Sequence, residues 1–196
     1  MKFKLENIAT IQSGIFSLFG QLGSAIYLQA NYFNEFGELK NTIRPNLVLN
    51  DKTERHLLDE GDILLAAKGN KNFAVLVKNK MLPAVASSTF LVLRIKREYL
   101  TKIIPEFLVW LLNHSHNQSI LKSKAVGSGV PSISKKSLSD FNVDIPEMTT
   151  QQNILVVDEL RKREKQIKQK IEQLREMQMQ QLLYNLKQPK AFAHGK

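Results

Sequence analysis

The chain has 196 residues, enough for one sizeable core or, as we favour, for a domain of about 150 residues with an appendage. The absence of cysteine excludes disulfides and cysteine-ligated metal, and the longest apolar runs are far too short to span a membrane. A net charge of +10, divided equally between residues 1–150 and 151–196, favours a polyanionic partner, nucleic acid before membrane; an incidentally basic soluble protein is the alternative.

The first fifty residues divide into a short regular element and a long loop. Residues 2–13 are compatible with a short strand or helix that ends at Gly14. No apolar stretch typical of an export signal follows the charged start, so we expect a cytoplasmic protein. Residues 14–50 are rich in Gly, Asn, Ser, Gln and aromatic residues, which is more typical of a binding surface than of scaffold. Phe16 and Phe19 are the exception, and we expect both in the core.

Two pairs of strands follow the loop. Each pair is predicted to form a hairpin, the first from residues 63–66 and 73–77 and the second from residues 81–86 and 89–95. In the first hairpin, Gly69 permits a tight polar tip from which Lys68 and Lys71 project. A plain solvated turn is an equally good interpretation of this tip.

A helix and a glycine loop come next. Pro105 opens a predicted helix over residues 106–124, on which Trp110 lies in a broad apolar face. Residues 125–138 then form a loop around Gly127 and Gly129, flanked by lysines and rich in free backbone donors. It lacks the Gly-Lys-Ser/Thr ending of a nucleotide-binding loop, so a nucleotide site is weakly supported. Residues 141–146 are predicted to form a closing strand.

The C-terminal stretch predicts one long helix. Residues 151–186 contain no Pro and no Gly, and polar, helix-favouring residues separate the aliphatic ones. The aliphatic residues follow the spacing of a coiled-coil seam, with Ile154 ahead of it and Glu164 its only polar member: Val157, Leu160, Ile167, Ile171 and Leu174. A narrow apolar stripe needs a partner, so we expect a helix from a second copy of the chain to pack on it.

Four runs carry a resemblance to a known family. They are GDILLAAKGN at 61–70, ASSTFLVLRI at 86–95, IPEFLVWLL at 104–112 and GSGVPSISKKSLSDFNVDIPEMTTQQNILVVDEL at 127–160. Together they resemble the target-recognition module of type I restriction-modification specificity subunits over nearly the whole chain. The last run is the most specific, since it joins a Gly-Ser-Gly loop to an Ile-Pro strand end and a Gln-Gln-Asn-Ile helix start.

The resemblance implies an α+β fold. A mixed, mainly β target-recognition domain is expected over residues 1–148, a long helix that pairs as an antiparallel coiled coil over 149–187, and a flexible tail over 188–196. A full specificity subunit of this family resembles two such modules, whereas this sequence shows one and no internal repeat. It looks like a half-subunit, so we expect a two-fold homodimer that reads a bipartite, palindromic DNA site. Residues 151–186, about 54 Å long as a helix, are expected to set the spacing of that site.

The resemblance also implies a role and partners. The chain is expected to bind double-stranded DNA and to direct methylase and restriction subunits, which use S-adenosylmethionine and ATP, so no cofactor is expected here. The residues themselves show no adenine-methylation loop and no Gly-rich cofactor loop after a strand. Asp59 and Asp62 near Lys68 are interpreted as a turn ahead of a strand rather than a metal site. We therefore expect a non-enzymatic chain without a metal.

Recognition is expected to divide between two sets of side chains. The residues predicted to reach base edges are Tyr32, Asn34, Arg44, Lys68, Asn70 and Lys71, and those predicted to contact phosphate are Lys122, Lys124, Ser128, Lys135 and Lys136. Arg44 and Asn70 are the preferred base readers, because Arg pairs two donors with guanine and Asn pairs two groups with adenine. For each residue the alternative is an ordinary solvated polar side chain.

Three other functions stay open at this point. The chain is compatible with a specificity module of a single-chain restriction-methylation enzyme, a coiled-coil protein adaptor or a nuclease with an unrecognised site. Salt-sensitive binding of random duplex would separate the adaptor from the others. Plasmid cleavage with Mg²⁺ would favour the nuclease.

Overall fold

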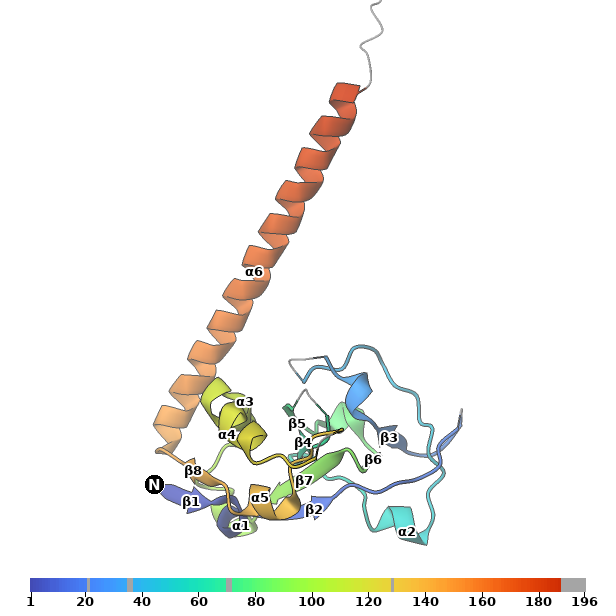
Figure 1. The fold of residues 1–196 in the computed structure, drawn as a ribbon, viewed down its shortest axis with the longest axis vertical. Helices are drawn as coiled ribbons and strands as arrows, with labels where there is room; N and C mark the ends of the chain where they lie inside the picture. Colours follow the sequence, from blue (N-terminus) through green and yellow to red (C-terminus); the bar gives the residue numbers. More distant parts are fainter. Residues whose placement is uncertain (21, 35–36, 70–71, 128, 188–196) are drawn as a thin grey trace, which may run out of the picture. The chain divides into compact units, whose positions relative to one another are not determined.

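The computed structural model describes residues 1–20, 22–34, 37–69, 72–127 and 129–187 (Figure 1). The chain divides into two compact units, the first over Met1–Asn153 and the second beginning at Ile154. The first unit, here called the recognition unit, mixes short strands and helices, and a long helix reaches from residue 148 to residue 187. The α+β class predicted from the sequence is therefore confirmed, while pairing of the long helix stays a prediction.

The main sheet of the recognition unit has four antiparallel strands in the order β2-β7-β4-β5. They are β2 (Ala9–Ser13), β7 (Phe90–Ile95), β4 (Ile63–Ala66) and β5 (Ala74–Leu76). All of β4 is buried, as its continuous apolar run requires. Its register pairs Leu64 with Val75 on one side and Val92 on the other. The first predicted hairpin, β4 with β5, is confirmed.

The second predicted hairpin is wrong. Strand β6 (Ala84–Ala86) pairs in parallel with β3 (Ile26–Leu28), a strand inside the segment predicted to be loop. On its other side β6 bridges to Leu57, and β7 lies between β2 and β4, so β6 and β7 belong to different sheets. The strand that pairs with β6 is far from it in the sequence. Pairing between such distant strands cannot be predicted from the local residue pattern.

The aromatic residues of this segment also depart from the prediction. Phe16 and Phe19, expected in the core, are 75% and 49% exposed. Their place is taken by Tyr27, which is 4% exposed, and by Phe33, which packs edge to face on Phe90 with ring centroids 6.0 Å apart. Composition indicated a binding surface, yet two aromatic side chains of this segment, Tyr27 and Phe33, belong to the core.

Both ends of the recognition unit meet in a small sheet. Strand β1 (Lys2–Lys4) pairs antiparallel with β8 (Asn142–Asp144), and helix α1 (Leu5–Ile8) separates β1 from β2. The segment expected to be strand or helix therefore contains both. Short elements complete the chain: η1 (Ala30–Tyr32), α2 (Asp51–Glu54), η2 (Asn79–Met81), η3 (Arg97–Tyr99) and α5 (Lys135–Ser139).

The helix predicted over residues 106–124 is broken in two. Helix α3 (Pro105–Asn113) and helix α4 (Ser115–Ser123) are separated by His114, whose ψ of 135° is extended. The break frees the side chain of Asn113 to pair with the backbone of Ala74: its Oδ1 accepts from Ala74 N at 2.7 Å and its Nδ2 donates to Ala74 O at 2.8 Å. This amide covers the edge strand β5. The tertiary contact therefore decides where the helix breaks, against the continuous apolar periodicity of the sequence.

Helix α6 (Met148–Lys187) begins three residues before the predicted Pro- and Gly-free stretch at 151–186 and one residue before the expected helix domain at 149–187. Its first turn belongs to the recognition unit through Gln151, which is fully buried. Gln151 Oε1 accepts from Ile104 N at 2.9 Å, and its Nε2 donates to Lys102 O at 2.7 Å and Pro146 O at 2.8 Å. One amide side chain thereby satisfies three backbone groups. In the described chain no helix is long and apolar enough for a membrane span.

Replacing Gln151 with Leu should destabilise the recognition unit by about 2 kcal/mol, because three backbone groups lose their hydrogen-bond partner in a buried place. Urea unfolding followed by the fluorescence of the single tryptophan, Trp110, measures this change. Gln152→Leu makes the same substitution at the exposed neighbouring position and should change stability little. Equal losses in the two variants would contradict the anchoring role of Gln151.

Candidate functional site

Two loops far apart in the sequence lie side by side in the recognition unit. The turn after β4 and the glycine loop are joined by two backbone hydrogen bonds, Gly69 N to Pro131 O at 2.9 Å and Ile133 N to Ala67 O at 2.8 Å. Gly69 has a φ of +100°, which glycine adopts without strain. The structure thus brings exposed Lys68 next to the glycine loop. We call the turn after β4 (residues 67–72) and the loop around Gly127 and Gly129 the paired loops.

The glycine loop is a closed hairpin. Val126 and Ser132 exchange two backbone hydrogen bonds of 3.0 Å across it. Gly127 has a φ of +127°, and a Cβ at this position would lie 2.9 Å from the carbonyl oxygen of Val130. Val126 and Val130 are 77% and 65% exposed. Three predicted site residues, Asn70, Lys71 and Ser128, lie outside the described residues.

Four predicted phosphate contacts are exposed. They come from two short helices that flank the glycine loop. Lys122 lies in the last turn of α4 and Lys124 is the first residue after it, while Lys135 and Lys136 begin α5. The Nζ of Lys124 lies 5.8 Å from the centre of the Phe141 ring, which fixes its position. Ser134 caps α5 by accepting a hydrogen bond from Ser137 N at 2.9 Å. The cap at Ser134 thus sets the start of α5 and with it the positions of Lys135 and Lys136.

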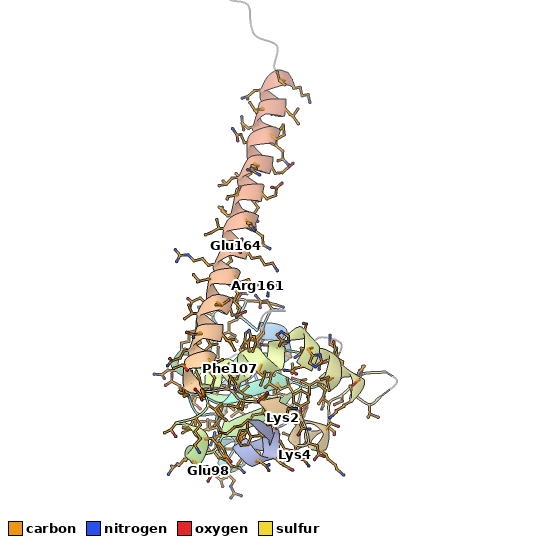
Figure 2. All side chains as sticks on the ribbon, turned by 90° about the vertical axis from the view of Figure 1, so that its left-hand side faces the viewer. Lys2, Lys4, Glu98, Phe107, Arg161 and Glu164 are labelled. Atoms are coloured by element: carbon orange, nitrogen blue, oxygen red, sulfur yellow. The ribbon has the colours of Figure 1, made fainter. Side chains whose placement is uncertain are left out.

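A fifth lysine, which no local sequence pattern indicates, joins this group. Lys4 Nζ (labelled in Figure 2) lies 3.0 Å from Asp140 Oδ1. The hydrogen bond from Lys4 holds the pKa of Asp140 below its usual value, and the charges of Lys136 and Lys124 act in the same direction. Asp140 therefore stays ionised at neutral pH among three lysines. Pairing of β1 with β8 brings Lys4 here, so only long-range topology reveals it.

The predicted base readers in the N-terminal loop have different surroundings. Tyr32 is half-buried against the core, and its hydroxyl lies 3.4 Å from Asn46 Nδ2. Asn34 is engaged in its own loop: its Oδ1 accepts from Glu38 N and its Nδ2 donates to Glu38 Oε2, both at 2.9 Å. Arg44 is exposed. No hydrogen bond or ion pair among the described residues joins Arg44 to the paired loops.

Asp59 and Asp62 precede β4 while Lys68 follows it, and both carboxylates form ion pairs with Arg94. Asp62 is 1% exposed and receives Arg94 Nε and Nη2, each at 2.7 Å, while Asp59 Oδ2 lies 2.7 Å from Arg94 Nη1. The hydrogen bond to Asp62 is the main cause that raises the pKa of Arg94 above its usual value. Asp62 is thus used to hold the turn before β4 against β7. Within the described ranges no cluster of three or more potential metal ligands occurs.

The predicted seam residues share one property in the second unit. All are exposed in the single chain, with values of 64% for Val157, 61% for Leu160, 52% for Ile167, 44% for Ile171 and 50% for Leu174. Figure 2 shows Arg161 and Glu164 extending from the same helix. The hydrogen bond from Lys168 to Glu164, 2.6 Å between the charged atoms, is the main cause that lowers the pKa of that carboxyl group. An exposed apolar stripe on an otherwise charged helix is a surface suited to packing against another helix.

A comparison with protein-family models shows the family of this chain. A family model described as the type I restriction modification DNA specificity domain matches residues 1–173. No curated protein matches the chain.

Three solved structures share the fold. A chain from a study of complex assembly and conformational transition of the type I R-M system is 16% identical, with a TM-score of 0.70 over 100% of this chain and 51% of that one. The HsdS subunit from Thermoanaerobacter tengcongensis is 19% identical, with a TM-score of 0.66 over 97% and 50%. The type I S subunit from M. genitalium is 14% identical, with a TM-score of 0.55 over 81% and 39%. This chain spans about half the length of the first two.

Proposed function

The chain belongs to the family of type I restriction modification DNA specificity domains, and from this premise we propose that it selects the DNA site of a type I restriction-modification complex. In this role it does no chemistry itself and guides methylase and restriction subunits to their target. The observation that carries the proposal is the family match over residues 1–173, which includes the whole recognition unit and part of α6. The basic net charge of +10 supports DNA as the ligand.

Selection from a random-sequence duplex library tests this function. The chain, immobilised at moderate salt, should enrich one motif, because base-edge contacts distinguish sequences by about 1–3 kcal/mol per good contact. Enrichment of no motif, with equal binding of all sequences, would contradict a specificity role.

We propose that the paired loops and the flanking lysines form one DNA-binding surface. Lys68, Asn70 and Lys71 would face base edges from the turn after β4, and Lys122, Lys124, Ser128, Lys135 and Lys136 would hold phosphates beside it. The proximity of Lys68 to the glycine loop supports this grouping. Tyr32, Asn34 and Arg44 complete the proposed set of base readers; Arg44 is the strongest of the three because its exposed guanidinium is uncommitted in the described structure.

Replacing Arg44 with Ala should relax one base-pair position of the selected motif and leave the other positions unchanged. The physical reason is that an arginine with two donors distinguishes guanine from other bases, whereas a phosphate contact distinguishes none. Library selection with the variant measures this. Lys136→Ala is the control and should weaken all sequences alike. A motif unchanged by Arg44→Ala would remove Arg44 from the base readers.

Replacing Asp140 with Asn should raise the affinity for random duplex about threefold at low salt, since Lys4, Lys124 and Lys136 lose a competing anion and one more phosphate contact forms. Fluorescence anisotropy against salt concentration measures the affinity and its salt slope. Asp51→Asn, an exposed acidic position in α2, changes the net charge equally and should have a smaller effect. Equal gains in both variants would show that only net charge matters.

We further propose that two copies of the chain pair through α6 as an antiparallel coiled coil. The support is the row of exposed apolar residues from Val157 to Leu174. Helix α6 has 40 residues and is therefore about 60 Å long, which suits it to hold two recognition units apart. A two-fold pair of this kind would read two half-sites of opposite orientation.

A further inference from the structure

A hollow of about 310 Å³ lies beside the loop that follows β2. Aromatic side chains from Phe16, Phe19 and Tyr27 line one part of it, and Asn31, Ser88 and Thr89 line another. Neither the paired loops nor the seam includes these residues. The hollow is therefore a feature that the proposed DNA-binding surface leaves without a role.

The aromatic part is held in place by several contacts. A Cβ on Gly14 would lie 2.1 Å from Ser87 O, and one on Gly23 would lie 2.3 Å from Leu47 N, so the loop is fixed at both ends by close backbone approach. The buried hydroxyl of Tyr27 donates to Ile15 O at 2.8 Å, and its ring stacks on Phe19 with centroids 5.2 Å apart. The exposed ring of Phe16 thus follows a backbone position, Ile15, that the Tyr27 hydroxyl holds in place.

The hollow is neutral. The sequence contains no charged residue from position 14 to position 34. Within the described structure the side chains of Gln29, Asn31 and Ser88 make no hydrogen bond and are available to a ligand. Aromatic faces beside neutral donors and acceptors suit a flat, uncharged heteroaromatic ring, whereas a phosphate or carboxylate would find no positive charge among the lining residues.

The hollow adjoins the paired loops. Ala67 N donates to Thr89 O at 2.9 Å, and Ile133 N donates to Ala67 O at 2.8 Å. Thr89, which lines the hollow, is therefore connected by backbone hydrogen bonds to both of the paired loops. At the rim, Lys40 Nζ lies 3.0 Å from Asn31 O and offers a cation to a backbone phosphate. A ligand that entered the hollow from DNA would therefore remain attached to the proposed DNA-binding surface.

We propose that this hollow receives a single nucleobase that has left the stack of the bound DNA, with its face on Phe16 and Phe19 and its edge toward Asn31 and Ser88. The inference rests on the proposed DNA-binding function and adds a base-extrusion site to it. Extrusion costs least where a base is already unpaired. Stacking on an aromatic side chain repays that cost without regard to sequence.

Two duplexes of identical sequence test the site, one fully paired and one with a single extrahelical thymine. The full chain should bind the bulged duplex about fivefold or more tightly than the paired one, by fluorescence anisotropy. Phe16→Ala should bring the ratio close to one without weakening binding of paired duplex, and Phe16→Trp should retain the ratio. Val48→Ala, at an exposed apolar position outside the lining, should leave it unchanged. Photocrosslinking from 5-iodouracil at the bulge should label the peptide that contains Phe16 and Phe19.

Each other outcome overturns the inference. Equal affinity of the unaltered chain for both duplexes removes the base site and leaves the proposed function standing. A preference that survives in Phe16→Ala arises from the flexibility of bulged DNA rather than from the hollow. Loss of methylase-subunit binding in Phe16→Ala with an unchanged ratio would assign the loop to a protein partner. Absence of binding to either duplex at low salt overturns both the inference and the proposed function.

Discussion

Replacing Ile167 and Ile171 together with Asp is expected to make the chain monomeric and to abolish tight binding of a two-part DNA site. Both side chains are about half exposed in the single chain and lie at the centre of the proposed seam. Burial of an isoleucine contributes about 1.5–3 kcal/mol, and a dimer contains each position twice. The unpaired carboxylates add a desolvation penalty. The dimer dissociation constant should rise by a factor of at least about 10³.

Sedimentation equilibrium measures the association, and circular dichroism confirms that the recognition unit keeps its structure. Gln169→Asp with Gln173→Asp is the matched control, since it adds two carboxylates to the face of the helix away from the seam. That variant should remain dimeric. If the unaltered chain is monomeric at all concentrations, or if both double variants dissociate equally, the seam is not the contact between two copies.

Replacing Lys122, Lys124, Lys135 and Lys136 together with Gln should lower the affinity for random duplex by about 100-fold at moderate salt. Four phosphate contacts would be lost, and the slope of log affinity against log salt should fall by about 3.6. Lys124 and Lys136 are placed on one surface by their shared proximity to Asp140, while Lys122 and Lys135 are their chain neighbours at the ends of α4 and α5.

The control for this variant removes the same charge elsewhere on the recognition unit. Lys52, Arg55, Lys78 and Lys80 are exposed and lie outside the paired loops and the flanking helices. Their replacement with Gln should change the salt slope far less. Equal slopes in the two variants would mean that overall charge, rather than this surface, holds the DNA.

Local pattern predicted the elements whose partners are close in sequence. The β4–β5 hairpin followed from two apolar runs around a turn, and α6 followed from a long stretch without Pro or Gly. The pairing of β6 with β3 could not be predicted from local pattern, because β3 is far from β6 in the sequence. The break at His114 was also missed, since the contact of Asn113 with Ala74 is tertiary.

The same division applies to the candidate site. Motif order from residue 61 to residue 160 predicted the family, and the family match confirms it. The lysines of α4 and α5 were visible as charges beside a glycine loop. The place of Lys4 in this group could not be predicted, because it depends on the pairing of β1 with β8, which brings Lys4 next to Asp140. Asn34 looked available in the sequence, yet the structure engages its side chain with Glu38.

Methylome sequencing tests the central proposal most directly. It compares cells that carry the partner methylase subunit with and without this chain, under otherwise equal conditions. Adenine methylation is expected at one bipartite motif, with half-sites of opposite orientation, only in cells that contain the chain. Identical methylation patterns in the two kinds of cell would contradict it.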